Sequence, residues 1–203
     1  MKDFFAKAVI LDQDCYVVDL TRQSDNVLKV EILTSPYEDD LKYVVNGVDK
    51  ILKKEEIRYF CLKKKNRNQK LPYLAVNLEN YPAFIKGIDN CECVFASLSE
   101  CNKPWVLFLE TKYCLEKNIK EYCKKAFSQM ENILKKLENE NLVDRNKKRI
   151  YFSYSAPGYD ELAPFNSFIY TQDELTEIKK QGINLLYYNT ILIAAGNALQ
   201  APT

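Results

Sequence analysis

Histidine is missing from this chain of 203 residues. Its absence excludes Ser-His-Asp and Cys-His catalysis, HNH-type cleavage and every zinc site that uses histidine ligands. Chemistry on this chain must therefore come from carboxylates, lysine, cysteine, tyrosine, serine, or a metal ion held by oxygen atoms.

Three further features are absent. The seven cysteines show no CxxC spacing, so they match neither an iron–sulfur nor a zinc pattern. The first residues, MKDFFAKAVILDQD, place acids inside what would have to be an apolar signal run. No apolar stretch approaches the roughly 18 residues of a membrane span. We therefore expect a cytoplasmic protein with free thiols and no membrane partner.

Charge is nearly balanced, with 29 basic and 28 acidic residues and a net charge of +1. Affinity for nucleic acid would then be modest unless basic residues cluster on one surface. One such cluster is residues 63–70, KKKNRNQK, which is typical of a solvated loop and is also suited to phosphates. The oligomeric state stays open, and a homodimer is one of the options.

The length fits one domain over residues 1–203. We divide it into an N-terminal β region (1–34), a core (35–140) and a C-terminal strand–helix–strand unit (149–193). β-rich runs predict strands over residues 15–20, 27–33, 71–78, 91–97, 105–113, 149–155 and 183–193. Three- and four-residue apolar spacing predicts helices over residues 41–52, 55–62 and 115–140. A last helix is expected between a capping box at Thr171 and Glu174 and a stop at Gly182. The alternation predicts an α/β fold, with a mixed central sheet flanked by helices.

The most informative segment is the strand predicted at 105–113, WVLFLETKY. Its five leading apolar residues indicate a central strand covered on both faces. Glu110 and Lys112 are two residues apart and so project from one face. Burying such charges costs several kcal/mol per ion, roughly, unless they are paired or hold a metal. The alternative is that the strand has reached the sheet edge at Glu110 and carries a surface ion pair.

A hairpin with the preceding strand would bring a second carboxylate to Glu110. If the loop is centred near Cys101, Ser97 faces Trp105 and Glu92 faces Glu110. Two carboxylates that close repel unless a cation or proton lies between them. Mg²⁺ is suited because it prefers oxygen ligands. A register slip of one residue would move Glu92 to the other face.

A carboxylate on one strand, Glu-x-Lys on the next and then an amphipathic helix resemble the PD-(D/E)xK nuclease superfamily. The resemblance covers residues 87–137 and implies a restriction-endonuclease-like fold. It also implies hydrolysis of phosphodiester bonds in DNA or RNA with Mg²⁺ or Mn²⁺. Glu92, or else Asp89, would bind the metal together with Glu110. Lys112 would position or polarise the attacking water. Gln129 would match a glutamine that some members carry on the following helix, or else border its apolar face.

The family usually has aspartate as its first acid, where this strand offers Glu92, and Asp89 falls opposite Tyr113. An acid on a first helix is also common, and Glu38, Asp39, Asp40 and Asp49 are candidates. Basic residues that would contact the nucleic acid lie on the helix after the motif. They are Lys117, Lys120, Lys124 and Lys125.

Three hypotheses follow from the sequence. The first is a metal-dependent nuclease, in which Glu92, Glu110 and Lys112 converge. The second is a catalytically inactive nuclease fold that serves as a binding or assembly protein. The third is an unrelated α/β interaction domain whose Glu110 and Lys112 form a surface ion pair.

Overall fold

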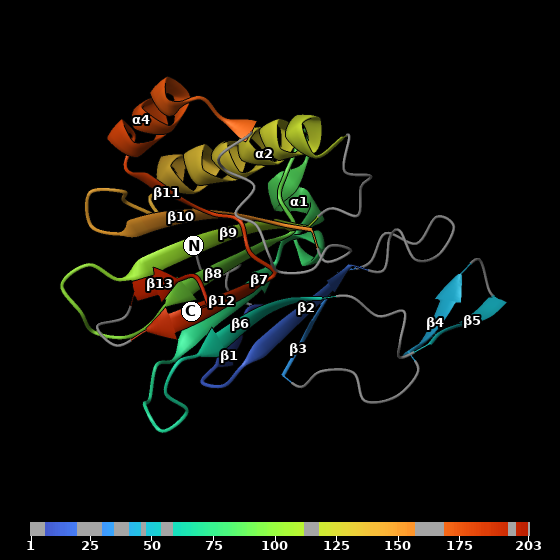
Figure 1. Ribbon diagram of the computed structural model, residues 1–203. Coiled ribbons are helices and arrows are strands. Elements are labelled where there is room, and N and C mark those ends of the chain that lie inside the picture. The colour runs from blue at the N-terminus through green and yellow to red at the C-terminus, as the bar shows by residue number, and fades with distance from the viewer. Residues whose placement is uncertain are drawn as a thin grey trace.

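Two mixed β-sheets lie face to face, and helices cover the outer face of the larger sheet (Figure 1). This computed structural model describes residues 7–19, 30–34, 41–45, 48–53, 59–111, 118–156, 169–194 and 198–202. The arrangement confirms the α/β class with a mixed sheet and flanking helices. The second sheet, on the face away from the helices, was not predicted.

The larger sheet has six strands in the order β1-β7-β8-β9-β10-β11. The strands β1, β7, β8 and β9 are antiparallel neighbours, whereas β9, β10 and β11 run parallel. Their bounds are β1 Val9–Leu11, β7 Tyr73–Asn77, β8 Cys93–Ser97, β9 Trp105–Thr111, β10 Arg149–Ser155 and β11 Ile183–Leu186. The helix α2, Ile119–Asn139, connects the parallel pair β9 and β10 across the sheet.

The smaller sheet has five strands in the order β13-β12-β6-β2-β3. Their bounds are β2 Cys15–Asp19, β3 Val30–Leu33, β6 Phe60–Lys64, β12 Thr190–Ala194 and β13 Ala198–Gln200. A separate two-stranded sheet consists of β4 Leu41–Val45 and β5 Val48–Leu52. The remaining elements are a 3-10 turn Leu78–Asn80 and the helices α1 Pro82–Ile85 and α4 Gln172–Lys180.

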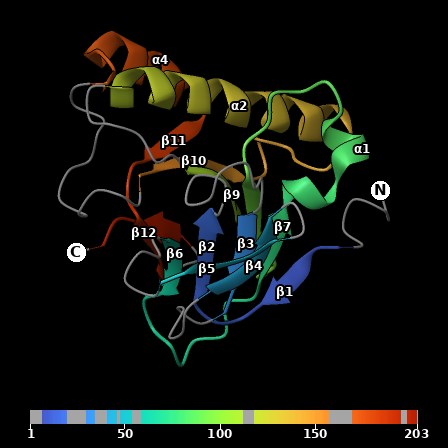
Figure 2. The same cartoon turned by 90° about the vertical axis from the view of Figure 1, so that its right-hand side faces the viewer.

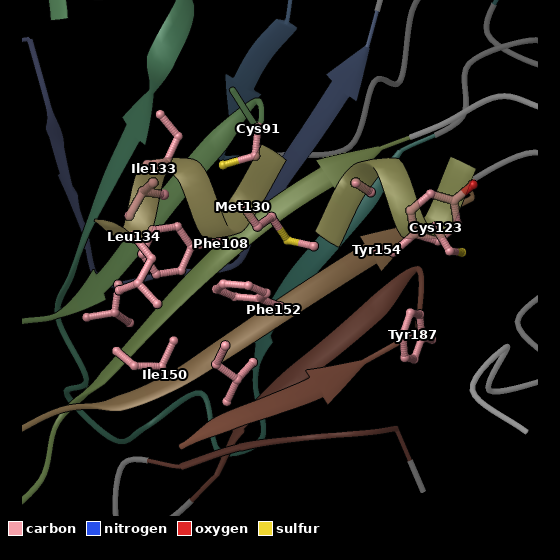
Figure 3. Packing of buried hydrophobic residues seen from close by; sticks show 14 of the residues in the cluster. Cys91, Phe108, Cys123, Met130, Ile133, Leu134, Ile150, Phe152, Tyr154 and Tyr187 are labelled. Atoms are coloured by element: carbon pink, nitrogen blue, oxygen red, sulfur yellow. The ribbon is translucent and has the colours of Figure 1, made fainter. Parts of the chain in front are cut away.

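Two hydrophobic clusters correspond to the two sides of the larger sheet. The helix-side cluster joins α2 to side chains such as Phe108, Ile150 and Phe152 (Figure 3). The inter-sheet cluster joins alternate residues of the same strands, such as Leu107 and Leu109, to the smaller sheet. All seven residues of β9 are buried because both faces of this strand are covered. In the described part of the chain, no helix is long and apolar enough to cross a membrane.

The predicted boundaries of several elements are confirmed. The strand β10 spans the predicted residues 149–155, and β7, β8 and β9 lie within their predicted ranges. The helix α4 begins at a complete capping box between Thr171 and Glu174. Gly182 follows the helix with φ of +77°, a conformation that favours glycine.

The helix predicted over residues 41–52 is wrong, because this segment forms the hairpin β4–β5 (Figure 2). Asp49 therefore lies on a strand, and Glu38, Asp39 and Asp40 fall outside the described residues. Of the helix predicted over 55–62, residues 55–58 lie outside the described residues, and its end is wrong because Phe60 begins β6. The strand predicted over 183–193 is two strands, β11 and β12, which belong to different sheets.

Buried thiol and phenol groups on β2 and β7 should make the fold sensitive to alkali. Burial raises the pKa of Tyr16 to about 12 and raises the pKa of Cys15 and Tyr73 as well. A folded-state pKa above the unfolded value favours the folded state at lower pH, and this contribution is lost as pH rises through the folded pKa. We expect the free energy of unfolding to fall between about pH 9 and about pH 12. Urea unfolding across this pH range measures the free energy of unfolding. Tyr16→Phe should make the decrease in that free energy smaller above about pH 10. A flat profile would contradict the prediction.

Candidate functional site

The candidate site lies where β8 begins and β9 ends, beneath α2. The Cα pairs of the hairpin run from Cys93 with Leu109 to Ala96 with Val106. This is the register predicted from a loop centred near Cys101. Glu92 directly precedes β8, and Glu110 is the penultimate residue of β9.

The ladder becomes irregular at Glu92. In a regular strand Cys91 and Cys93 would share a face, yet Cys91 packs in the helix-side cluster and Cys93 in the inter-sheet cluster. The backbone amide of Glu92 donates to the carbonyl of Leu109 at 3.1 Å, one residue short of the register of the strand. This irregularity turns the Glu92 side chain away from a simple cross-strand position.

The Glu92 carboxylate instead binds Thr111, the residue that follows Glu110. Its Oε2 accepts the backbone N–H of Thr111 at 2.9 Å and also accepts the Thr111 hydroxyl. Hydrogen bonds to an ionised carboxylate are stronger than those between neutral groups. Two donors on one oxygen therefore fix the orientation of Glu92 beside the Glu110–Thr111 peptide.

Glu110 is only 1% exposed. It follows Val106 and Phe108 in the alternation of β9, and these two side chains belong to the helix-side cluster. Glu110 thus projects towards the side that α2 covers, and it is not a surface residue. This burial removes the alternative in which the strand has already reached solvent at Glu110.

Asp89 and Gln129 meet beside the start of β8. The Gln129 side-chain amide, 7% exposed, donates to Oδ1 of Asp89 at 3.1 Å and to the carbonyl of Asn90 at 2.9 Å. Asn132, one turn further along α2, donates to the Asp89 carbonyl at 3.2 Å. Within the described residues the buried Oε1 of Gln129 accepts no hydrogen bond. Helix α2 therefore anchors the segment that leads into Glu92.

Neighbouring strand ends add polar groups that the sequence did not indicate. On the parallel strand β10, Ser155 lies beside Thr111, and its hydroxyl donates to Oδ1 of Asn189 at 2.8 Å. Asn189 also exchanges two hydrogen bonds with the backbone of Ala156. At the end of β7, Glu79 accepts the amide of Val30 at 2.9 Å. Glu79 could have been found from the sequence, because it is an acid that directly follows the strand predicted over 71–78.

The predicted basic residues differ in placement. Lys112 and Lys117 fall outside the described residues. Lys120 and Lys125 are exposed on α2. Lys124 pairs with Glu174 at 3.0 Å and lies 6.0 Å above the ring of Tyr170, so it faces α4.

The acidic side chains of the site are of the type that can hold a cation. Burial raises the pKa of Cys93, and the nearby charge of Glu92 raises it further. No group of three or more Cys, Asp or Glu side chains with metal-binding geometry occurs among the residues that the structure describes. Mg²⁺ commonly keeps several waters and is bound through one or two carboxylates. Glu92 and Glu110 are therefore ligands of the right chemical kind. The Thr111 hydroxyl that binds Glu92 lies on the inter-sheet side of β9, like Leu107 and Leu109, whereas Glu110 lies on the helix side, so the two acids flank the end of β9 from different faces.

Thr111 was not singled out from the sequence, although it is the middle residue of Glu-x-Lys. Because its hydroxyl donates to a carboxylate, we expect Thr111→Val to lower the free energy of unfolding by about 1.5–3 kcal/mol. Thr111→Ser keeps the donor and should cost less. Urea unfolding at neutral pH measures both variants. Equal losses in the two variants would show that packing, rather than the hydroxyl, is responsible.

Comparison of the chain with known proteins gave no match to a family model, a curated protein or a solved structure.

Proposed function

We propose that this chain is a nuclease that hydrolyses phosphodiester bonds of DNA or RNA with Mg²⁺ or Mn²⁺. The observation that carries the proposal is that Glu92 binds the amide and hydroxyl of Thr111, the residue after the buried Glu110, so that both acids lie at the same end of β8 and β9. Support for the proposal comes from two acids on adjacent strands at one end of a central sheet, the positions at which the resemblance to PD-(D/E)xK nucleases expects metal ligands. The proposal includes the restriction-endonuclease-like fold.

Each residue of the site has a stated task in this proposal. Glu92 and Glu110 would hold the ion, and Thr111 would keep Glu92 oriented towards it. Gln129 would fix the Asp89–Asn90 segment, so that the position of Glu92 is set by α2. Lys112 follows Thr111 in the sequence and would place positive charge beside the reacting phosphate. When bound, the ion would supply Lewis-acid charge at the phosphate.

One observation favours a second candidate function, an inactive nuclease fold that acts in binding or assembly. Glu92 and Asp89 both accept hydrogen bonds from within the chain, as structural carboxylates do. A structural role predicts no affinity for divalent ions. Binding of Mn²⁺, measured by calorimetry, therefore separates the two candidates.

The decisive experiment is cleavage of plasmid DNA, single-stranded DNA and RNA with Mg²⁺ or Mn²⁺. We expect the wild-type chain to cleave at least one of them, and chelation by EDTA to stop the reaction. Lys112→Ala should cleave much more slowly while still binding Mn²⁺. Cleavage that survives EDTA, or none by the wild type, would refute the nuclease proposal.

A further inference from the structure

A basic loop lies at the end of the sheets opposite the candidate site. It joins β6 to β7, and the amide of Leu98, just after β8, donates to the carbonyl of Pro72 within it. The candidate site, in contrast, adjoins the first residue of β8. Residues 63–70 carry four lysines and one arginine and no acid.

The base of this loop is held in place by two aspartates. Oδ1 of Asp12 accepts the Lys64 ammonium at 2.9 Å and the Leu71 amide at 2.8 Å. Oδ1 of Asp14 accepts the backbone amide of Lys64 at 3.0 Å. The hydrogen bond from Lys64 lowers the pKa of Asp12, which keeps this anchor ionised. Because these hydrogen bonds already hold the base of the loop, less conformational entropy is lost when the loop binds a partner.

The cations beyond this base project into solvent. Lys65 and Lys70 are exposed, and the Arg67 side chain is 85% exposed although its guanidinium lies 3.7 Å from a carboxylate oxygen of Asp14. Asn66 and Asn68 are exposed between them and offer amide donors. Lys103 is exposed at the same end of the larger sheet, where its carbonyl accepts Nε of Arg149 at 2.8 Å. The charged surface therefore extends beyond one loop.

We propose that Lys65, Arg67 and Lys70 bind the phosphate backbone of a nucleic acid, at a contact separate from the candidate site. Guanidinium and ammonium groups neutralise phosphates, and amides bind phosphate and sugar oxygens. Residues 65–70 contain no apolar side chain that would insert into a bilayer, so an anionic membrane is the less suitable partner. The choice of nucleic acid rests on the proposed function.

The test uses the full chain with Glu110→Gln and without divalent metal, so that binding is measured without cleavage. The probe is an end-labelled single-stranded DNA, and fluorescence anisotropy gives its affinity from about 50 to about 200 mM salt. The test variant carries Lys65→Ala, Arg67→Ala and Lys70→Ala. The matched control carries Lys135→Ala, Lys179→Ala and Lys180→Ala, which remove three exposed lysines on α2 and α4.

We expect the test variant to bind at least about tenfold more weakly, with a salt slope shallower by about two, since each single-strand phosphate contact contributes about 0.7. The control should bind like the parent. Equal binding by the two triple variants, no binding by the parent, or tighter binding to anionic lipid vesicles than to DNA would overturn the inference. If the chain binds the DNA but the wild type does not cleave nucleic acid, only the nuclease proposal is refuted.

Discussion

Glu110→Gln should reduce metal-dependent cleavage by about a hundredfold to a thousandfold, the size of effect seen when one electrostatic group is lost from an active site. An amide has nearly the shape of the carboxylate but carries no charge, and it is a poor ligand for a hard divalent cation. Glu110 is 1% exposed at the end of β9, so a substitution of the same size leaves the surrounding packing unchanged. Initial cleavage rates and calorimetric Mn²⁺ affinity should fall together.

Glu131→Gln provides the matched control for this experiment. Glu131 lies on α2 and pairs with Lys135 at 3.0 Å on the helix surface, away from the hairpin. Exposed pairs of this kind contribute about 0.3–0.5 kcal/mol, so neither cleavage nor stability should change much. Cleavage by Glu110→Gln at the wild-type rate would remove Glu110 from any catalytic role.

The register of the candidate hairpin could be predicted because a short loop joins β8 to β9, and a loop centred near Cys101 determines which residues pair. Burial of both strands on both faces gives no alternation that would select the register by itself. The irregularity at Glu92 could not be predicted in the same way. It places Cys91 in the helix-side cluster together with Met130 and Ile133 of α2, residues far apart from it in the sequence (Figure 3).

The hairpin β4–β5 shows how one apolar pattern supports two interpretations. Its valines and leucines recur at three- and four-residue intervals, which indicated a helix. The same residues flank Asn46-Gly47, the dipeptide most typical of a two-residue hairpin connection. Val45 pairs with Val48 across those two residues. The turn signal and the β-branched residues favour a hairpin over the helix that the spacing indicates.

Residues 183–193 divide into β11 and β12 where the side chain of Asn189, and not a strand backbone, forms hydrogen bonds with the backbone that follows β10. The side-chain amide of Asn189 accepts the Ala156 amide at Oδ1 and donates from Nδ2 to the Ala156 carbonyl. The backbone carbonyl of Asn189 accepts the backbone amide of Cys61 in β6. The chain thereby leaves the larger sheet and joins the smaller one. Both strands are apolar, so the sequence pattern does not reveal the transfer.

The helix-side core should be far more sensitive to substitution than the exposed surface, and Phe152 is its most informative position. This ring is fully buried on β10, and its centroid lies 5.3 Å from the ring of Phe108 and 5.3 Å from that of Phe127. We expect Phe152→Ala to lower the free energy of unfolding by about 3–5 kcal/mol, through lost burial and the cavity left behind. Total stabilities of about 5–15 kcal/mol make this a severe loss.

Urea unfolding measures this loss, with Phe152→Leu and Phe84→Ala as comparisons. Leucine refills much of the cavity, and Phe84 is only half-buried on α1, so both should cost clearly less. Because Phe152 precedes the candidate site on a neighbouring strand and supplies no ligand, the folded fraction of Phe152→Ala should bind Mn²⁺ as the wild type does. A variant of normal stability would show that this interface repacks without a cavity. Lost Mn²⁺ affinity in a fully folded variant would show that the Phe108–Phe152 contact also positions the end of β9.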